Sequence, residues 1–497
     1  MHYYDDKTYL PNPVVKENLL ISKKRGEHPG KEHAESKQYL PLVEGFSPLT
    51  ASCWDFCWKG VLDHRIQPTQ QNRFISEAVD TVFNGSVFLW DTVMTVQYAK
   101  YGSRAFDVAG SLDNFYARQH PDGFICREVR SSDGHESWNR HDPSSTGPDI
   151  FAWGEWDLYR LSGDVERLKT VLPALIGYFY WLRAYRRWPD GSRWHSGWGS
   201  GIDNQPRQRT VTLPGGIDTN FVPIQYYWFT PSAMGWIDAT AQALLSAQTL
   251  VKMIDITGSC TDHRDTIVAE RDLLYSVIHT SMYNEETGFY SDRHADGTVS
   301  EIKSLAAYWV ILTDDVPSDR VSRMVEMLED PKFFKRPHMI PALSADHPAY
   351  KEKGDYWNGG VWPPTNYLVL RALRKQGYHD LAYRIAKNHL DAVLKVFEET
   401  GTVWENYAPE KFEPGSLSKP DMLGWSGLGP IAVLIEFICG VEIDMPNSRV
   451  EIISPHATGY TLRGLSVGKG EQLTVVSSES GTTVETTLHT PLAVVQV

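Results

Sequence analysis

The chain has few cysteines, no excess of basic residues and no long hydrophobic run. Five cysteines in 497 residues, an odd number without metal-site spacing, favour a reducing compartment. Cys53 and Cys57 lie four residues apart, but no second Cys/His pair follows, so buried thiols are the simpler interpretation. The formal net charge of -14 argues against nucleic-acid binding, which needs clustered Lys and Arg. No run of about eighteen apolar residues is present to span a membrane.

The N-terminus also lacks a recognisable targeting signal. MHYYDDKTYLPNP contains no basic region followed by an apolar run, unlike a secretory signal. No sustained basic amphipathic helix is present to lie on a membrane surface. We therefore expect a cytoplasmic protein with neither a nucleic-acid nor a membrane partner, and the sequence leaves its oligomeric state open.

Aromatic side chains are abundant, with 17 Trp, 24 Tyr and 18 Phe. A large helical core accounts for most of them. Tryptophans in Gly/Pro loops need another explanation, because loops lie at the surface and often carry binding residues.

Six apolar segments alternate with more charged, amphipathic segments. The apolar segments begin near Trp90, Asp149, Ser232, Lys303, Pro364 and Met422. The amphipathic segments span residues 104–119, 164–187, 262–283, 318–328 and 379–398. Because a helix that is apolar all round must be buried and one with a polar face lies outside, the pattern predicts an (α/α)6 barrel over residues 71–440. An irregular helical array is the alternative.

The two ends of the chain differ from this mainly α region. Residues 441–497 contain short β-branched runs separated by Gly, Ser and Pro, which predict a small all-β region, with N-terminal strands as possible partners. Residues 1–70 mix polar segments and prolines with aromatic runs such as SCWDFCW, and we expect an irregular N-terminal extension. We expect this extension to wrap the main domain, and it is a candidate to supply aromatic residues to a cleft. The C-terminal region carries no pattern that indicates chemistry.

Two loops carry carboxylates among aromatic residues. GWGSGIDNQPR at 197–207 has Asp203 near its centre, and TVWENYAP at 402–409 carries Glu405. Hydrolysis of a glycosidic bond requires such a pair: one carboxyl protonates the leaving oxygen, and the other activates water or attacks carbon. Trp198 beside Asp203, and Trp153 on the common rim of the predicted barrel, are candidates to bind sugar. The sequence therefore predicts a glycoside hydrolase.

Each of these carboxylates has a simpler interpretation. An aspartate in a glycine-rich loop is often a turn former or a helix cap. Glu405 follows a helix that ends near residue 400, so it is equally a residue of a post-helix turn, and Glu410 is a nearby competitor in a more polar segment. The histidines are scattered without metal-ligand spacing, so we expect no metal site.

Several motifs resemble a known family. GWGSGIDNQPR is similar to the general-acid segment of glycoside hydrolase family 63, and trehalases of family 37 are similar in the same places. The other motifs of that clan occur in the same order, over roughly residues 75–440: FLWDT at 88–92, QHPDGFICRE at 119–128, YWNGGVWPPTNY at 356–367, WENY at 404–407 and LGWSGLGP at 423–430.

The resemblance implies an (α/α)6 barrel and an inverting mechanism without metal or cofactor. It makes Asp203 the general acid and Glu405 the general base. It also implies a sugar pocket lined by Trp90, Asp91, Trp362, Asn366, Tyr407 and Trp425. The chain has Asn358-Gly359-Gly360 where the family often has Arg-Gly-Pro, so a sugar contact made by that arginine does not carry over.

The substrate suggested by the resemblance is a small α-glycoside. Glucosylglycerate or mannosylglycerate comes first, and trehalose or another α-disaccharide second. The arginines available for a glycerate carboxylate are Arg127, Arg130, Arg207 and Arg209. Two alternatives belong to other classes: a sugar epimerase, which works with histidines facing the pocket, and a sugar-binding protein, which does not need both carboxylates.

General-acid chemistry near neutral pH requires Asp203 to have a raised pKa. We expect burial among Trp194 and Trp198, together with the field of Glu405, to raise it, and Arg207 to point elsewhere. Inversion requires a separation of about 6.5–9.5 Å between the two carboxyl groups.

Overall fold

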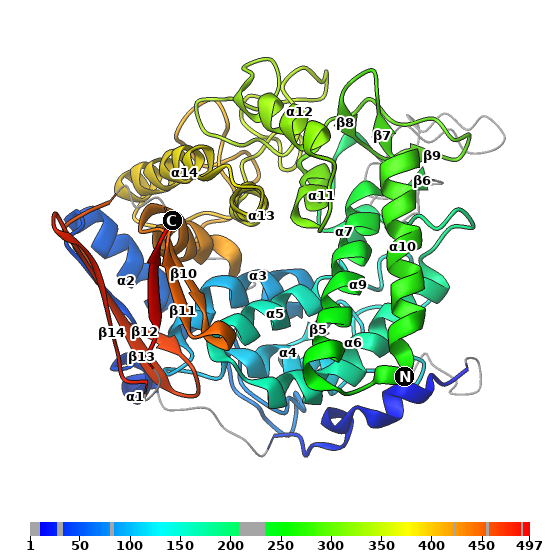
Figure 1. Cartoon of the computed structure of the whole chain (residues 1–497), viewed down its shortest axis with the longest axis horizontal. Helices are drawn as coiled ribbons and strands as arrows, with labels where there is room; N and C mark the ends of the chain where they lie inside the picture. Colours follow the sequence, from blue (N-terminus) through cyan, green and yellow to red (C-terminus); the bar gives the residue numbers. More distant parts are fainter. Residues whose placement is uncertain are drawn as a thin grey trace.

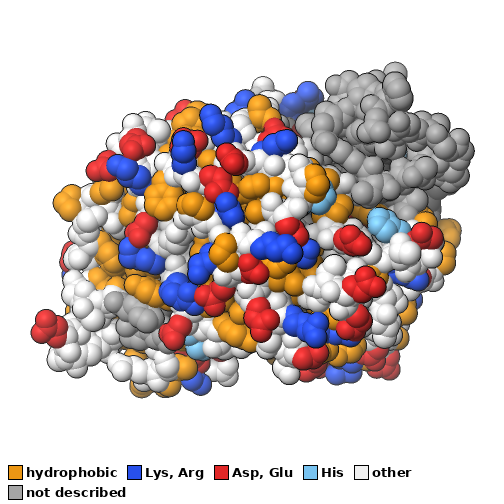
Figure 2. Space-filling model, turned by 90° about the horizontal axis from the view of Figure 1, so that it is seen from above, with side chains coloured by type: hydrophobic (Ala, Val, Ile, Leu, Met, Phe, Trp, Pro, Cys, Tyr) orange, Lys and Arg blue, Asp and Glu red, His pale blue; other side chains and the backbone are white. Residues whose placement is uncertain are grey.

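The computed structural model describes residues 10–26, 33–79, 84–207, 234–421, 424–453, 457–488 and 491–497. These residues are mainly helical, and Figure 1 shows the C-terminal strands gathered at one side of the helices. Within these ranges, no helix has both the length and the apolar character needed to cross a membrane. Figure 2 shows acidic and basic side chains interspersed over one face of the molecule.

The six predicted apolar segments contain buried helices. They are α3 (Leu89–Ala99), α5 (Phe151–Ser162), α9 (Ile237–Thr257), α11 (Tyr308–Leu312), α13 (Pro363–Lys375) and the π-helix η9 (Gly429–Ile438), which follows the 3-10 helix η8 (Gly424–Leu428). All residues of α3 and η9 are buried, as the absence of a polar face predicts. Each helix contacts the next in chain order, and η8 and η9 contact α3, so the contacts return to their starting point.

The predicted amphipathic segments contain helices that pack outside the first set. They are α4 (Val108–Tyr116), α6 (Val165–Tyr185), α10 (Arg264–Ser281), α12 (Ser318–Glu329) and α14 (His379–Thr400). On α12 the buried residues Val321, Met324, Val325 and Leu328 follow the spacing of a single apolar stripe. Helices α6 and α10 pack against α9, and α14 packs against α13 and η9.

A further helix, α2 (Pro48–Asp63), lies within the stretch that we expected to be irregular. Ser47 caps it by accepting a hydrogen bond from the Thr50 amide, and Pro48 occupies its first turn. Trp54 and Trp58, four residues apart, belong to its buried face, so SCWDFCW carried a helical signal. Helix α2 packs against η9 and α14 and so belongs to the outer set.

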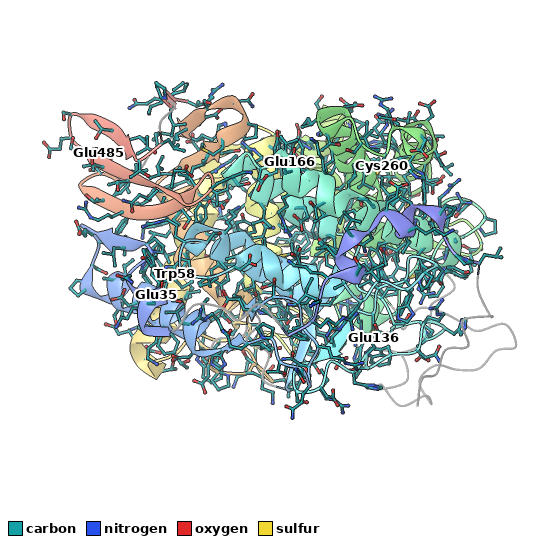
Figure 3. All side chains as sticks on the ribbon, turned by 90° about the horizontal axis from the view of Figure 1, so that it is seen from below. Glu35, Trp58, Glu136, Glu166, Cys260 and Glu485 are labelled. Carbon is teal, nitrogen blue, oxygen red and sulfur yellow. The ribbon has the colours of Figure 1, made fainter. Side chains whose placement is uncertain are left out.

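The C-terminal residues form strands, as predicted. One sheet has the order β1-β12-β13-β14, and the other has the order β10-β11-β15. The strands are β10 (Val441–Asp444), β11 (Arg449–Ile452), β12 (Tyr460–Val467), β13 (Glu471–Ser478), β14 (Gly481–Thr486), β15 (Ala493–Gln496) and the N-terminal β1 (Leu42–Glu44). Strand β1 pairs antiparallel with β12, with Leu42 opposite Arg463, so the two ends of the chain share one sheet. Figure 3 shows Trp58 of α2 and Glu485 of β14 on one side of the molecule, with Cys260 on the other.

Short elements complete the described part of the chain. The strands are β2 (Arg65–Ile66), β3 (Ala78–Val79), β4 (Ser86–Phe88), β5 (Glu128–Arg130), β6 (Met234–Gly235), β7 (Tyr283–Asn284), β8 (Phe289–Tyr290) and β9 (Arg293–His294). The short helices are α1 (His33–Lys37), α7 (Gly197–Ser200), η1 (Pro13–Glu17), η2 (Leu19–Ser22), η3 (Lys100–Gly102), η6 (Thr261–His263), η7 (Leu305–Ala307) and η10 (Met445–Asn447).

The contact between α3 and η8 leaves no room for a side chain at Gly427. A methyl group there would lie 2.5 Å from the Tyr98 ring, whose hydroxyl donates to the Gly424 carbonyl oxygen at 2.8 Å. We therefore expect Gly427→Ala to lower the free energy of unfolding by about 1–3 kcal/mol, measured by chemical denaturation. In a Tyr98→Leu background the same change should cost much less, because the smaller side chain frees space. An equal loss in both backgrounds would contradict this explanation.

Candidate active site

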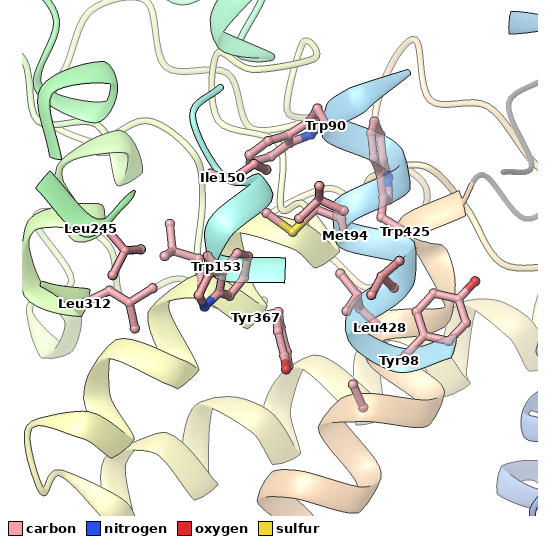
Figure 4. Packing of buried hydrophobic residues seen from close by; sticks show 14 of the residues in the cluster. Trp90, Met94, Tyr98, Ile150, Trp153, Leu245, Leu312, Tyr367, Trp425 and Leu428 are labelled. Atoms are coloured by element: carbon pink, nitrogen blue, oxygen red, sulfur yellow. The ribbon is translucent and has the colours of Figure 1, made fainter. Parts of the chain in front are cut away.

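A cavity of about 700 Å³ brings the two predicted carboxylate loops together. The predicted residues that line it are Asp203, Glu405, Trp90, Asp91, Trp198, Trp362 and Trp425. They come from α3 and η8, from the residue preceding α13, and from the two loops. In Figure 4, Trp90 and Trp425 lie toward one end of the helices, and Trp153 lies further in.

The loop that carries Asp203 is fixed on both sides of the carboxyl. The short helix α7 is capped by Ser196, whose hydroxyl accepts from the Gly199 amide, and Gly201, with φ +76°, follows its last residue. Only glycine adopts that backbone easily, and Gly201 packs against the Trp90 ring. After the carboxyl, the Asn204 side chain accepts from the Trp357 amide at 2.9 Å and donates to the Asp355 carbonyl at 3.1 Å.

Hydrogen bonds from three residues hold Glu405. Its Oε1 accepts from the Tyr356 hydroxyl at 3.0 Å, and its Oε2 accepts from the Lys419 amide at 3.1 Å. The Glu405 amide donates to the Lys419 carbonyl at 2.8 Å, and the Trp425 indole donates to the Glu405 carbonyl at 3.1 Å. The carboxyl therefore has a fixed orientation at the cavity wall.

Burial raises the pKa of both carboxyls. It raises the pKa of Asp203 to about 7, opposed by the positive charge of Arg127. Burial also raises the pKa of Glu405 to about 7; the hydrogen bonds from Tyr356 and Lys419 oppose the rise, and the charge of Asp203 adds to it. Because hydrogen bonds donated to a carboxylate stabilise its anion, those from Tyr356 and Lys419 favour the ionised form of Glu405.

The raised pKa of Asp203 agrees with the expectation, but one expected neighbour is different. Trp194 does not line the cavity; its ring lies 6.0 Å from Trp188 and under the Arg186 guanidinium. Asp149 shows that burial alone does not mark a site, because burial also raises its pKa to about 7 although it is not part of the cavity lining. What distinguishes Asp203 and Glu405 is that they share a cavity.

Arg207 points away from Asp203, as expected. Its guanidinium forms ion pairs with Asp238 at 2.8 Å and Asp292 at 2.6 Å, and all three side chains are buried. Of the other arginines considered for a carboxylate, Arg127 lines the cavity, Arg130 is exposed and paired with Asp133, and Arg209 lies outside the described residues.

Three residues predicted to contact sugar do not line the cavity, which corrects their assignment to the pocket. The Asn366 side chain is fully buried and bonds to the Ile340 backbone. The Tyr407 hydroxyl accepts from the Trp404 amide, and its ring packs against buried histidines. Trp153 packs edge-on against Trp309. All three side chains are buried in the protein interior. Residue type alone did not distinguish a buried side chain from one that faces the cavity.

Other lining residues were not singled out from the sequence. Tyr356 and Trp357 lie in YWNGGVWPPTNY, and the Trp357 ring stacks on Trp362 with a centroid distance of 3.8 Å. Glu128 is the last residue of QHPDGFICRE, so these three residues could have been identified from the two motifs. Trp138 lies in no motif and could not, because only the fold brings it to the cavity. Among the described residues, no group of three or more His, Cys, Asp or Glu side chains is placed to hold a metal ion.

The chain is similar to several known proteins. A family model described as "Mannosylglycerate hydrolase MGH1-like glycoside hydrolase domain" matches residues 101–419. A glucosylglycerate hydrolase of Mycolicibacterium hassiacum is 23% identical over 308 residues, covering 49% of this chain and 67% of that enzyme. An uncharacterised protein of Borreliella burgdorferi is 23% identical over 402 residues, 78% of each chain. The structure of a GH63 mannosylglycerate hydrolase from Thermus thermophilus in complex with glucose has a TM-score of 0.59 at 18% identity, covering 78% of this chain and 99% of that one.

The protein is a glycoside hydrolase. The chain belongs to the MGH1-like glycoside hydrolase domain family, of the glycoside hydrolase family 63 type.

The buried Asp203 carboxyl should make stability depend on pH. Its pKa is raised from 3.8 to about 7, so between these values the unfolded chain loses the proton first and stability falls as pH rises. We expect Asp203→Asn to leave the free energy of unfolding nearly unchanged at the lowest pH at which the fold persists. At pH 8 it should raise that free energy, by about 4 kcal/mol at most. Denaturation at the two pH values measures the difference.

Asp133→Asn provides the control for this experiment. Asp133 is exposed, and its pKa is lowered mainly by its hydrogen bond to Arg130, so its removal should not stabilise the protein at pH 8. If Asp203→Asn has the same effect at both pH values, the carboxyl does not titrate as described.

Proposed function

We propose that the protein hydrolyses a small α-glycoside with inversion, and that Asp203 is the general acid and Glu405 the general base. The observation that carries the proposal is that two carboxyls from distant loops line one aromatic cavity and have pKa values raised to about 7. A carboxyl that is neutral near pH 7 can donate a proton, and an ionised partner can accept one.

The proposed reaction uses one protonated and one ionised carboxyl. Protonated Asp203 donates its proton to the glycosidic oxygen as that bond breaks. Glu405, ionised and oriented by Tyr356 and the Lys419 amide, removes a proton from the water that attacks the anomeric carbon. Solvent then returns a proton to Asp203 and removes one from Glu405. Aromatic walls exclude bulk water, which keeps the pKa of the acid raised.

Sugar binding is assigned to the other predicted residues that line the cavity. The rings of Trp90, Trp198, Trp362 and Trp425 offer flat apolar faces, and Asp91 offers hydrogen-bond acceptors for sugar hydroxyls. We also propose that the six buried helices and their outer partners close into an (α/α)6 barrel with this cavity at one end. The contacts that run from α3 round to η8 and η9, and back to α3, support that architecture.

Glucosylglycerate and mannosylglycerate are the first candidate substrates, because the named relatives include a glucosylglycerate hydrolase and mannosylglycerate hydrolases. Trehalose is the second, because yeast neutral trehalase Nth1 has a similar fold, with a TM-score of 0.52 at 16% identity. Incubation with both glycerate glycosides, trehalose, an aryl α-glucoside and an aryl α-mannoside, followed by assay of free sugar, tests the proposal. Release from a glycerate glycoside is expected. Absence of release from all five would overturn the function.

Replacing either carboxyl should abolish most of the activity. We expect Asp203→Asn and Glu405→Gln each to lower kcat by about three orders of magnitude or more, because one proton transfer is lost while sugar contacts remain. Initial rates on the best substrate, with sugar binding followed by calorimetry, measure both effects.

Two control variants test whether the loss of activity is specific to these two carboxyls, rather than common to any buried carboxyl or to any glutamate in that segment. Asp149→Asn changes a buried carboxyl outside the cavity lining whose pKa is also raised to about 7, and Glu410→Gln changes the nearby glutamate that pairs with Arg336. Both should retain kcat within about tenfold. A loss in Glu410→Gln that matched the loss in Glu405→Gln would remove the special role of Glu405.

A further inference from the structure

Arg127 and Lys419 are the basic residues that line the cavity in the described part of the chain. Lys419 is exposed, whereas the Arg127 side chain is only 11% exposed. The backbone of Arg127 is fixed on both sides: its carbonyl accepts from the Leu89 amide at 2.8 Å, and its amide donates to the Ser145 carbonyl at 2.9 Å. Arg127 is therefore held against the first turn of α3.

The side chain of Arg127 is also held in place. Its Nε donates to the Ser144 carbonyl at 2.7 Å, and its guanidinium lies 4.9 Å from the Trp138 ring centroid and 5.5 Å from that of Trp198. These contacts fix a planar cation before any ligand binds, which reduces the entropy lost on binding.

The acidic residue that lies near the Arg127 guanidinium, Glu128, does not form a hydrogen bond with it. Glu128 lies 3.7 Å away, beyond hydrogen-bonding distance, and its oxygens accept from the Ser86 hydroxyl at 2.9 Å and the Trp138 indole at 2.7 Å. Within the described ranges, Arg127 therefore meets no carboxylate at hydrogen-bonding distance. The Arg207 guanidinium, by contrast, is saturated by two carboxylates.

The position of Arg127 relative to Asp203 indicates which part of a glycoside it faces. Arg127 and Asp203 line the same cavity, and the Arg127 guanidinium lies 5.5 Å from the ring centroid of Trp198, which belongs to the loop that carries Asp203. Its positive charge also lowers the pKa of the Asp203 carboxyl. A general acid protonates the glycosidic oxygen, which departs with the leaving group. A cation beside the acid therefore lies close to the leaving group.

We propose that Arg127 determines specificity by binding a carboxylate on the leaving group of the substrate. A planar guanidinium can donate two parallel hydrogen bonds to a carboxylate, a geometry that the Lys419 ammonium lacks. The inference rests on the proposed function, because it takes Asp203 as the acid. It explains how a cavity that also contains Asp91, Glu128 and Glu405 admits an anionic substrate.

A matched pair of substrates tests the proposal: α-glucosylglycerate, and α-glucosylglycerol, in which a hydroxymethyl group replaces the carboxylate. If the mannosyl compound is preferred, the corresponding mannosyl pair is used. The wild-type kcat/KM should favour the anionic substrate. Arg127→Gln should lower kcat/KM for the anionic substrate by about a hundredfold, and for the neutral one by less than tenfold, because only the first loses a charge-assisted pair.

Arg130→Gln is the matched control. Arg130 lies in the same strand region but is exposed, so its replacement should change the preference little. A loss that is equal for both substrates in Arg127→Gln would overturn the proposal, because Arg127 would then act on Asp203 or on the fold alone. Equal wild-type rates on both substrates would also overturn it.

Binding of D-glycerate, with glycerol as the neutral probe, gives a readout that does not depend on hydrolysis. Calorimetry should show D-glycerate binding at least tenfold more weakly to Arg127→Gln than to the wild type, and no such difference for glycerol. If this holds while neither glycoside is hydrolysed, the proposed function fails and the carboxylate site stands. If D-glycerate binds both proteins equally, the carboxylate site is wrong.

Discussion

The free-energy cost of ionising a buried carboxyl is the constraint on which this site depends. Asp203 reaches a pKa of about 7 because it is removed from water, and one cation, Arg127, opposes that shift. A second arginine four residues along the chain would oppose it further, but Asp238 and Asp292 bind the Arg207 guanidinium in a buried cluster. The anchoring of Asn204 to the Trp357 and Asp355 backbone keeps the carboxyl at the cavity.

The two carboxyls have similar pKa values but different surroundings. Burial raises both pKa values; the charge of Arg127 opposes the rise at Asp203, and the hydrogen bonds from the Tyr356 hydroxyl and the Lys419 amide oppose it at Glu405. These donors stabilise a negative charge at Glu405 and orient it. Because the two pKa values are alike, the proposed assignment of Glu405 as the base draws on these hydrogen bonds.

The sequence predicted the parts of the fold that local patterns encode. The apolar and amphipathic segments became buried and outer helices, because each pattern reports which sides of a helix meet the core. Helix α2 was missed although Trp54 and Trp58 have helical spacing, since the mixed polar segments around it obscured the period. Within the candidate site, the motifs contain the two loops that the fold brings to one cavity. They did not distinguish the buried residues Asn366 and Tyr407 from residues that line the cavity. The sequence also did not show that the chain between Arg127 and Trp138 turns back, pairing Val129 with Glu136, so that the two side chains meet.

The central claim is that Asp203 and Glu405 act from opposite sides of one glycosidic bond with a water molecule between them. The measurement that tests it most directly is proton NMR of the first sugar released from an α-glycoside, recorded before the anomers equilibrate. The account predicts that the β-anomer appears first, because water attacks the face opposite the departing group. Initial appearance of the α-anomer would mean retention of configuration and would contradict it.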